Sequence, residues 1–224
     1  MSETGGISQE QAALRQAFGC GAALADTIAA LGRSGGHERG AVLWPRGEEA
    51  GAAGLLTLGR AAELAYGRDG AVLVLHALAE GEFFGEIVGS GAQGETRVEA
   101  LSDGTAMHFA SSAIVRLMES YPLVALAMAR HLSARIAAMR QRMLETALLS
   151  ATGRVAAELL RRSRATDDGV IRPLPVWSEL AVIVQSTRET VSRTVSGLEK
   201  RGIVNRTADG LAVVAPHRLE ELVY

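Results

Sequence analysis

The chain has 224 residues, 48% of them hydrophobic and 21% charged, which is typical of a globular protein with one large core or two small ones. Its single cysteine, Cys20, excludes an internal disulfide and the several thiolates of an iron–sulfur cluster or structural zinc site, and is expected to be a small buried hydrophobe. The sequence lacks a basic-then-apolar leader, and no apolar run approaches the ~20 residues that span a bilayer, so we expect a cytoplasmic protein with no membrane partner.

The net charge of −2 is unevenly distributed along the chain. Residues 1–118 hold 8 basic against 14 acidic residues, residues 119–149 hold 4 against 2, and residues 150–224 hold 11 against 9. An acidic front and a mildly basic rear indicate modules with different partners.

Frequent glycines separate short apolar runs in the first half, where 20 of the 25 glycines precede residue 106. Short helices are predicted near 8–18 and 22–32, and two strand-like runs then flank the turn sequence GRDG at 67–70. This pattern predicts that residues 1–118 form a small antiparallel barrel or roll with helices at its ends.

A long uninterrupted helix is predicted from Pro122 to Ser150, because proline suits the first turn and no later glycine or proline breaks it. At 1.5 Å per residue it would be roughly 40 Å long, longer than a typical globular helix. Its apolar residues follow a near-heptad spacing of 4, 4, 3 and 4, which favours a parallel dimer over the alternative of packing along the roll. The expected seam consists of Met128, Leu132, Ile136, Met139 and Met143.

Residues 150–224 have the pattern of a winged helix–turn–helix. Ser150 can cap a new helix, two helical segments follow a poorly helical crossing, and two short strands surround an Asp-Gly turn at the close. Ser186 and Glu189 form a capping-box pattern, which predicts that the second helix of the pair starts at Ser186.

The second helix of the pair has two contrasting faces. Val191, Val195 and Leu198 cluster on one side, which is expected to face the domain core. At ~100° per residue, the polar side chains fall within an arc of about 140°, and they are Arg188, Glu189, Ser192, Arg193 and Ser196. Arginine can bond a guanine edge and glutamate can accept from cytosine, so this face suits the DNA major groove. The alternative is a solvated helix face with a Glu189–Arg193 pair.

The segment TRETVSR at 187–193, together with GEFFGE, the long helix and ATGRVA in order, resembles the cyclic-AMP receptor protein and fumarate–nitrate regulator (CRP/FNR) superfamily of bacterial transcription factors. The resemblance covers nearly the whole chain. Two residues depart from the family's usual pattern: Gln185 stands where members have a turn glycine, and Val176 stands where they have a polar cap. It implies an α+β fold with three parts: a cyclic-nucleotide-binding-type β-roll of antiparallel strands (1–118), a dimerisation helix (119–149) and a winged helix–turn–helix (150–224). It also implies a homodimer that binds double-stranded DNA and contacts RNA polymerase.

The resemblance assigns DNA contacts to individual residues. Arg188 and Arg193 would read guanines, and Glu189 would read a cytosine. Thr187 and Thr190 would contact phosphates, and Ser192 lies on the same polar face. Members with this pattern read half-sites that resemble TGTGA, so a palindrome of that kind is expected.

The resemblance also locates an effector pocket that departs from the pattern of cyclic-AMP binders. Gly85 and Glu86 match the residues that hold the ribose, although Glu86 could equally be a structural residue that accepts backbone N–H bonds. Gly94 and Glu95 replace the arginine and hydroxyl residue that hold the phosphate. A carboxylate there repels a phosphate, and the lost charge-assisted contact is typically worth about 1.5–3 kcal/mol. Arg97 could be a displaced phosphate ligand, although strand periodicity directs it to the face opposite Gly94.

On the long helix, Arg135 matches an arginine that helps to hold the ligand, whereas Met139 replaces a hydroxyl residue that meets the base. We therefore expect no ordinary cyclic-AMP binding. The pocket would take another ligand, such as a cyclic dinucleotide, or none. Neither a cofactor nor a metal is expected, because the five histidines lack metal-ligand spacing; they are His37, His76, His108, His131 and His217.

The sequence does not favour two other classes of function, an enzyme and a scaffold protein. An enzyme is not expected, because the sequence has no phosphate-binding glycine loop and no nucleophile–base pair, and Asp167 and Asp168 read as solvated turn residues. A regulatory or scaffold protein that has lost DNA binding would not need the intact Arg188–Glu189–Arg193 face.

Overall fold

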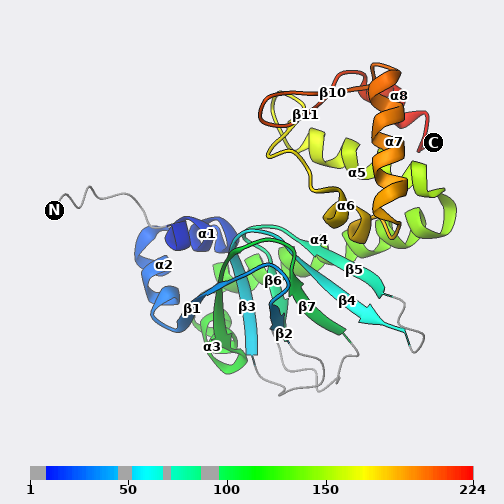
Figure 1. The fold of residues 1–224 in the computed structure, drawn as a ribbon. Helices are drawn as coiled ribbons and strands as arrows, with labels where there is room; N and C mark the ends of the chain where they lie inside the picture. The colour runs from blue at the N-terminus through cyan, green and yellow to red at the C-terminus, as the bar shows by residue number, and fades with distance from the viewer. Residues whose placement is uncertain (1–8, 45–51, 68–71, 87–95, 224) are drawn as a thin grey trace. The chain divides into compact units, whose positions relative to one another are not determined.

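The computed structural model describes the chain in four stretches, 9–44, 52–67, 72–86 and 96–223. They belong to two compact units, Met1–Met139 and Arg140–Tyr224, each of which is described by itself (Figure 1). The division into functional segments at 118 and 149 stays a prediction. Within the described stretches, no helix is both long and apolar enough to cross a membrane.

The N-terminal unit is built on two four-stranded antiparallel sheets. The first has the order β1-β8-β3-β6, with β1 at Gly32–His37, β8 at Gly104–Ala110, β3 at Ala52–Leu58 and β6 at Phe83–Gly85. The second has the order β2-β7-β4-β5, with β2 at Val42–Trp44, β7 at Thr96–Ala100, β4 at Ala61–Tyr66 and β5 at Val72–Leu78. The predicted pairing across GRDG is confirmed, since β4 and β5 pair antiparallel, while residues 68–70 of the turn lie outside the described stretches.

Two apolar layers hold this unit together. Helices α1 (Gln9–Phe18), α2 (Ala22–Ala29), α3 (Ser111–Ser120) and the start of α4 (Pro122–Leu148) pack with one face of the first sheet. Phe84, Val98 and Ala106 belong to a second core that draws on both sheets. Cys20 is buried in the first layer, as expected of a small hydrophobe.

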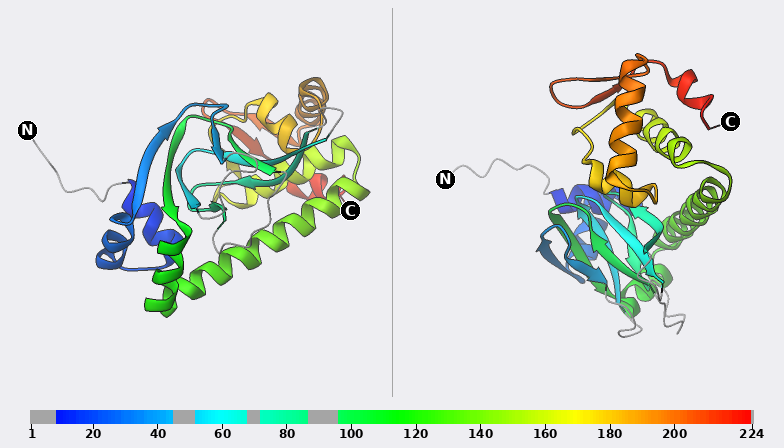
Figure 2. Two further views of the ribbon diagram at one scale, coloured as in Figure 1. Left: turned by 90° about the horizontal axis from the view of Figure 1, so that it is seen from below. Right: turned by 45° about the vertical axis from the view of Figure 1, so that its right-hand side comes forward.

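Helix α4 runs unbroken from Pro122 to Leu148, which confirms the predicted long helix (Figure 2). The expected seam is corrected at one position, because Met128 is fully buried in the core of the N-terminal unit and cannot meet a partner. The other four members are exposed, with Ile136 at 66% and Met143 at 75%. The seam of exposed apolar side chains therefore consists of Leu132, Ile136, Met139 and Met143.

The C-terminal unit is a winged helix–turn–helix, as predicted. Its helices are α5 (Ala151–Arg164), α6 (Trp177–Ile183), α7 (Arg188–Lys200) and α8 (Pro216–Glu220), and its sheet has the order β10-β11-β9, with β9 at Val170–Ile171, β10 at Val204–Arg206 and β11 at Leu211–Val213. The Ser150 side chain accepts a hydrogen bond from the Gly153 amide at 3.1 Å, which confirms the predicted cap of α5. The Val176 side chain makes no such bond at the start of α6.

The turn between α6 and α7 is a Schellman motif with glutamine in the position that glycine usually occupies. The Ser186 amide donates to the Ala181 carbonyl at 2.9 Å, and the Gln185 amide donates to the Val182 carbonyl at 3.2 Å. Gln185 has a φ of 51°, the only positive φ outside glycine in the described residues, so the turn is strained as its sequence suggested.

The predicted helix start at Ser186 is wrong by two residues. The Ser186 amide is committed to ending α6, so the chain stays extended through Thr187 and α7 begins at Arg188. The Thr187 hydroxyl accepts from the Thr190 amide at 3.2 Å and caps the helix in place of Ser186.

Replacement of Gln185 by glycine is expected to raise the free energy of unfolding of the C-terminal unit by about 0.5–1 kcal/mol. Relief of the left-handed backbone contributes about 1–2 kcal/mol, and the greater freedom of glycine in the unfolded chain offsets part of it. Urea unfolding followed by circular dichroism would measure the change. The same replacement at Gln16, exposed within helix α1, should cost roughly 1 kcal/mol. A loss of stability at both positions would contradict the strain at Gln185.

Candidate nucleic-acid interface

Helix α7 presents one apolar and one polar side. Val191, Val195 and Leu198 are at most 2% exposed in the core of the C-terminal unit, where the sequence pattern places them. Arg188, Glu189 and Arg193 are exposed on the other side. The apolar contacts therefore fix the direction in which the charged side chains point.

Three exposed charged side chains of α7 have no polar partner among the described residues. Across the described residues, the side chains of Arg188, Glu189 and Arg193 form neither a hydrogen bond nor an ion pair, so the alternative Glu189–Arg193 pair is not formed. Two guanidinium groups and a carboxylate are left with their bonding capacity free for an external partner.

The hydroxyl residues beside them differ in their local roles. The Thr187 and Thr190 hydroxyls lie 3.0 Å apart at the start of α7, where Thr187 is also the helix cap. Ser192 is half-buried on the first full turn. The N-terminal end of a helix attracts anions through its free amides and its dipole, which suits hydroxyl contacts with phosphates.

Ion pairs brace the wing against the rest of the C-terminal unit. Arg206 of β10 pairs with Glu199 of α7 at 2.7 Å, and its guanidinium lies 5.5 Å from the Trp177 ring centre. Arg172 bonds Asp168 at 2.8 Å and Asp209 of the wing turn at 2.6 Å. Asp168 is thus a structural turn residue, in line with the reading of this aspartate from the sequence.

In the N-terminal unit, Arg135 of α4 is paired with an acidic residue that the sequence analysis missed. Its guanidinium bonds the Glu63 carboxylate of β4 and lies 3.5 Å from the Phe83 carbonyl oxygen. The second oxygen of Glu63 accepts from the Thr96 hydroxyl at 3.1 Å. The positive charge expected to hold an anionic ligand is therefore compensated within the chain.

Arg97 belongs to a separate cluster on the neighbouring strands. Its guanidinium lies 4.1 Å from the Tyr66 ring centre, bonds the Tyr66 hydroxyl at 2.6 and 2.9 Å, and pairs with Glu99. Burial, with the hydrogen bond to the Glu99 carboxylate, raises the pKa of Tyr66. Arg97 is thus engaged by Tyr66 and Glu99. The neighbouring Thr96 belongs to the other cluster, with Glu63 and Arg135.

The other expected pocket residues have varied surroundings. Gly85 has a φ of 77°, and a side chain there would meet the Trp44 ring at 2.8 Å. The Glu86 amide donates to the Ala52 carbonyl at 3.0 Å. Met139 is 37% exposed, and Glu95 lies outside the described stretches.

Two histidines of the N-terminal unit lie beside polar groups. His76 lies 3.4 Å from the Glu82 carboxylate, and the His131 ring nitrogen lies 2.8 Å from the Ala17 carbonyl oxygen. Burial would raise the pKa of Glu82, but the hydrogen bonds from His76 and the Ala79 amide outweigh it and lower the pKa. No group of side chains suited to a metal ion occurs within the described part of the chain.

Comparison with known proteins shows what the two units resemble. Residues 153–222 match the family model of the Crp-like helix–turn–helix domain. FixK2 of Bradyrhizobium japonicum is 21% identical with a TM-score of 0.75, over 86% of this chain and 98% of its own. A CooA variant of Carboxydothermus hydrogenoformans is 18% identical with a TM-score of 0.72, over 88% of this chain and 90% of its own.

A third similar structure is CLP of Xanthomonas campestris, described as a c-di-GMP responsive global regulator, with 19% identity and a TM-score of 0.68 over 86% of this chain and 99% of its own. A search of curated proteins gave no match. The C-terminal unit is thus a Crp-like helix–turn–helix domain. Over most of its length the chain shares the fold of FixK2, CooA and CLP, which confirms the predicted α+β architecture, and the match of residues 153–222 is in line with the resemblance.

Proposed function

We propose that the protein is a sequence-specific DNA-binding transcription regulator that acts in the cytoplasm as a homodimer on a TGTGA-like palindrome. The observation that carries this proposal is the polar face of α7, the recognition helix, on which Arg188, Glu189 and Arg193 are exposed and have no polar partner among the described residues. The Crp-like fold of residues 153–222 supports placing this helix in the major groove. RNA polymerase is the proposed protein partner.

The exposed seam of α4 supports the homodimer. Its four apolar side chains, defined above, keep the near-heptad spacing of 4, 3 and 4, and each is more than a third exposed in one chain. Pairing two parallel copies of the helix would remove this surface from water and would relate the two recognition helices by a two-fold axis, as a palindrome requires.

DNA binding is proposed to be independent of ordinary cyclic AMP. Arg135 is already paired with Glu63, and Arg97 is engaged by Tyr66 and Glu99, so neither arginine is free to hold a phosphate. A cyclic phosphate that approached Arg135 would have to displace a carboxylate fixed by the Thr96 hydroxyl. The Glu63 carboxylate carries the same sign of charge as the phosphate and would also repel it.

Fluorescence anisotropy on a labelled TGTGA-N6-TCACA duplex and a scrambled duplex tests the proposal. At ~150 mM salt, we expect the palindrome to be bound roughly a thousandfold or more tightly than the scrambled duplex. Cyclic AMP at millimolar concentration should not change either affinity. The salt concentration is held fixed, because phosphate contacts make both affinities strongly salt-dependent.

Two further arms separate the alternatives. Binding only with cyclic AMP would contradict effector independence. Binding only with cyclic di-GMP would favour a regulator controlled by another ligand, which is the property that the description of CLP assigns to that protein. The absence of sequence preference under all conditions would contradict the proposed function and would favour a scaffold that has lost DNA binding.

A further inference from the structure

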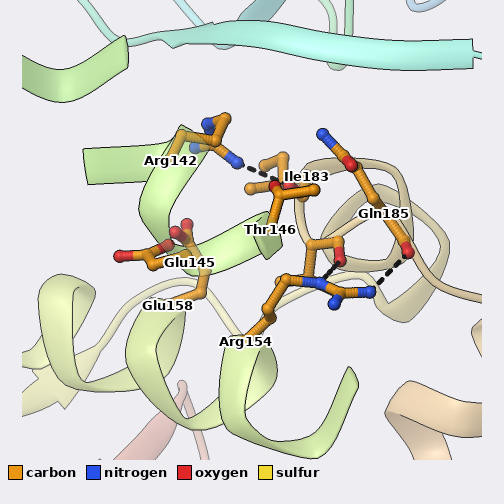
Figure 3. Close-up of a pocket in the computed structure, with 8 residues that line it drawn as sticks. Arg142, Glu145, Thr146, Arg154, Glu158, Ile183 and Gln185 are labelled. Atoms are coloured by element: carbon orange, nitrogen blue, oxygen red, sulfur yellow. Dashed lines mark hydrogen bonds between the residues drawn. The ribbon is translucent and has the colours of Figure 1, made fainter. Parts of the chain in front are cut away.

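Two arginines contact the backbone of the turn that leads into the recognition helix (Figure 3). Arg142 lies in the last two turns of α4, and Arg154 lies in the first turn of α5. Together with residues 183–185 they line a small pocket within the C-terminal unit. No sequence pattern described above predicts a role for either arginine.

The turn leaves a run of carbonyl groups for these arginines. The last carbonyls of any α-helix lack partners within it. The Schellman hydrogen bonds satisfy the Ala181 and Val182 carbonyls. The next three carbonyls, those of Ile183, Val184 and Gln185, accept from guanidinium groups instead.

Arg154 joins three segments through one planar group. Its Nε donates to the Val184 carbonyl at 2.8 Å, its Nη2 to the Gln185 carbonyl at 3.0 Å, and its Nη1 to the Leu149 carbonyl at 2.9 Å. The end of α4, the end of α6 and the strained turn are therefore held in one arrangement. A lysine has a single nitrogen and cannot reproduce this fork.

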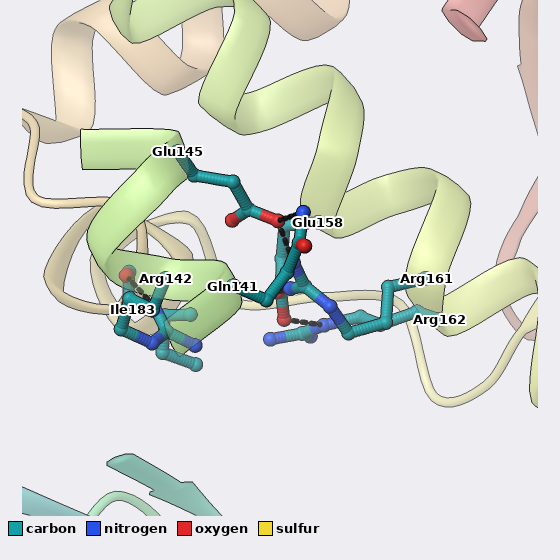
Figure 4. A network of polar contacts seen from close by, with 7 residues as sticks. All are labelled: Gln141, Arg142, Glu145, Glu158, Arg161, Arg162 and Ile183. Carbon is teal, nitrogen blue, oxygen red and sulfur yellow. Dashed lines mark hydrogen bonds and ion pairs between the residues drawn. The ribbon is translucent and has the colours of Figure 1, made fainter. Parts of the chain in front are cut away.

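Arg142 completes the set with a bond to the Ile183 carbonyl at 2.5 Å. Burial lowers the pKa of Arg142, whereas the Glu158 and Glu145 carboxylates favour its charged form. Both carboxylates are buried and are themselves held by arginines (Figure 4). Glu145 pairs with Arg161, and Glu158 pairs with Arg161 and, at 2.8 Å, with Arg162.

We infer that Arg142 and Arg154 are positioning residues for DNA reading, which hold the strained Gln185 turn and fix the start of the recognition helix to the end of α4. This inference rests on the proposed function. Neither side chain is required to touch DNA. They act through the backbone of residues 183–185, so they set the direction in which Arg188 and its neighbours meet the base edges.

The anisotropy assay tests the inference with Arg154→Ala. The affinity for the palindrome is expected to fall about 10- to 100-fold, because three charge-assisted bonds are lost. The affinity for the scrambled duplex should change less than about threefold, because phosphate binding depends on surface charge more than on exact direction. Arg164→Ala is the matched control, since it removes an exposed arginine of the same helix and should leave the ratio of the two affinities unchanged.

Rescue by glycine distinguishes positioning from direct reading. Gln185→Gly removes the backbone strain that the Arg154 hydrogen bonds stabilise. When it is added to Arg154→Ala, the affinity for the palindrome should rise at least about threefold. It should restore nothing to Arg188→Ala, whose lost contact is to the base itself. Arg154→Lys should behave like Arg154→Ala, because the charge is kept and the fork is lost.

The outcomes separate this inference from the proposed function. A wild-type protein without sequence preference would contradict the proposed function. A wild-type protein with preference, and a folded Arg154→Ala variant with the same ratio of affinities, would overturn the inference alone. If circular dichroism shows that Arg154→Ala is unfolded, Arg154→Lys and Arg142→Met take its place, and an unchanged ratio in both would equally overturn it.

Discussion

Replacement of Arg188 by alanine is expected to remove most of the preference for a TGTGA-type palindrome. Arg188 is the first residue of α7, is exposed and forms no hydrogen bond or ion pair within the described part of the chain, so its guanidinium is free to bond a guanine edge. One bidentate contact of this kind discriminates by about 1–3 kcal/mol. Two copies in a dimer would give about 2–6 kcal/mol, a loss of palindrome affinity of roughly 30- to 20,000-fold.

The measurement is a pair of anisotropy titrations on palindrome and scrambled duplexes, with Arg201→Ala as the control. Arg201 is exposed just beyond the C-terminal end of the same helix, so its removal changes the net charge equally. Arg201→Ala should lower the affinity for both duplexes by the same factor. A folded Arg188→Ala variant that keeps its preference would show that the polar face of α7 does not read the site.

Replacement of Ile136 by glutamate is expected to dissociate the proposed dimer. Ile136 is 66% exposed in one chain, at the middle of the seam on α4. In a parallel pair, two new carboxylates would face each other across the two-fold axis, each removed from water without a partner. The dimer dissociation constant should rise roughly a hundredfold or more, because an unpaired buried charge costs several kcal/mol.

Sedimentation velocity at micromolar concentration would measure the change in mass. Ala134→Glu is the matched control, because Ala134 is exposed on the same helix about 160° around the axis from Ile136. The control should remain dimeric. A wild-type chain that sediments as a monomer, or an Ile136→Glu variant that remains dimeric, would contradict this role of the seam.

Periodicity was sufficient for the elements that are stabilised locally. The 3.6-residue pattern of α7 placed Val191, Val195 and Leu198 in the core, and the unbroken run after Pro122 gave the long helix. Strand β1 was not predicted, because Gly32–His37 is rich in glycine and lacks the β-branched residues typical of strands. There the structure needs glycine, since a side chain at Gly32 would meet the Phe109 ring at 2.6 Å.

The errors at Ser186 and Met128 have the same origin. A capping pattern and a heptad stripe are local signals, whereas the structure decides each position by a tertiary contact. The Ser186 amide is used to end the preceding helix, and Met128 is drawn into the core beside α1 and the first sheet.

The polar contacts of the candidate sites could not be read from the sequence. Glu63 and Arg135 are 72 positions apart, and Arg142 and Ile183 are 41 apart. No periodic pattern links residues at such distances. Arg154 stands in the ATGRVA segment on which the resemblance rests. Its three acceptors are backbone carbonyls, which every residue carries, so only the folded chain shows which of them it bonds.

The burial of Cys20 has a practical consequence for the chemistry of the chain. It is the only cysteine, it is 9% exposed, and burial raises the pKa of its thiol, so little reactive thiolate forms near neutral pH. Alkylating reagents should therefore leave the native chain largely unmodified. A cysteine introduced at an exposed position, such as Lys200 at the end of α7, would be the one site that a maleimide dye or a nitroxide label modifies.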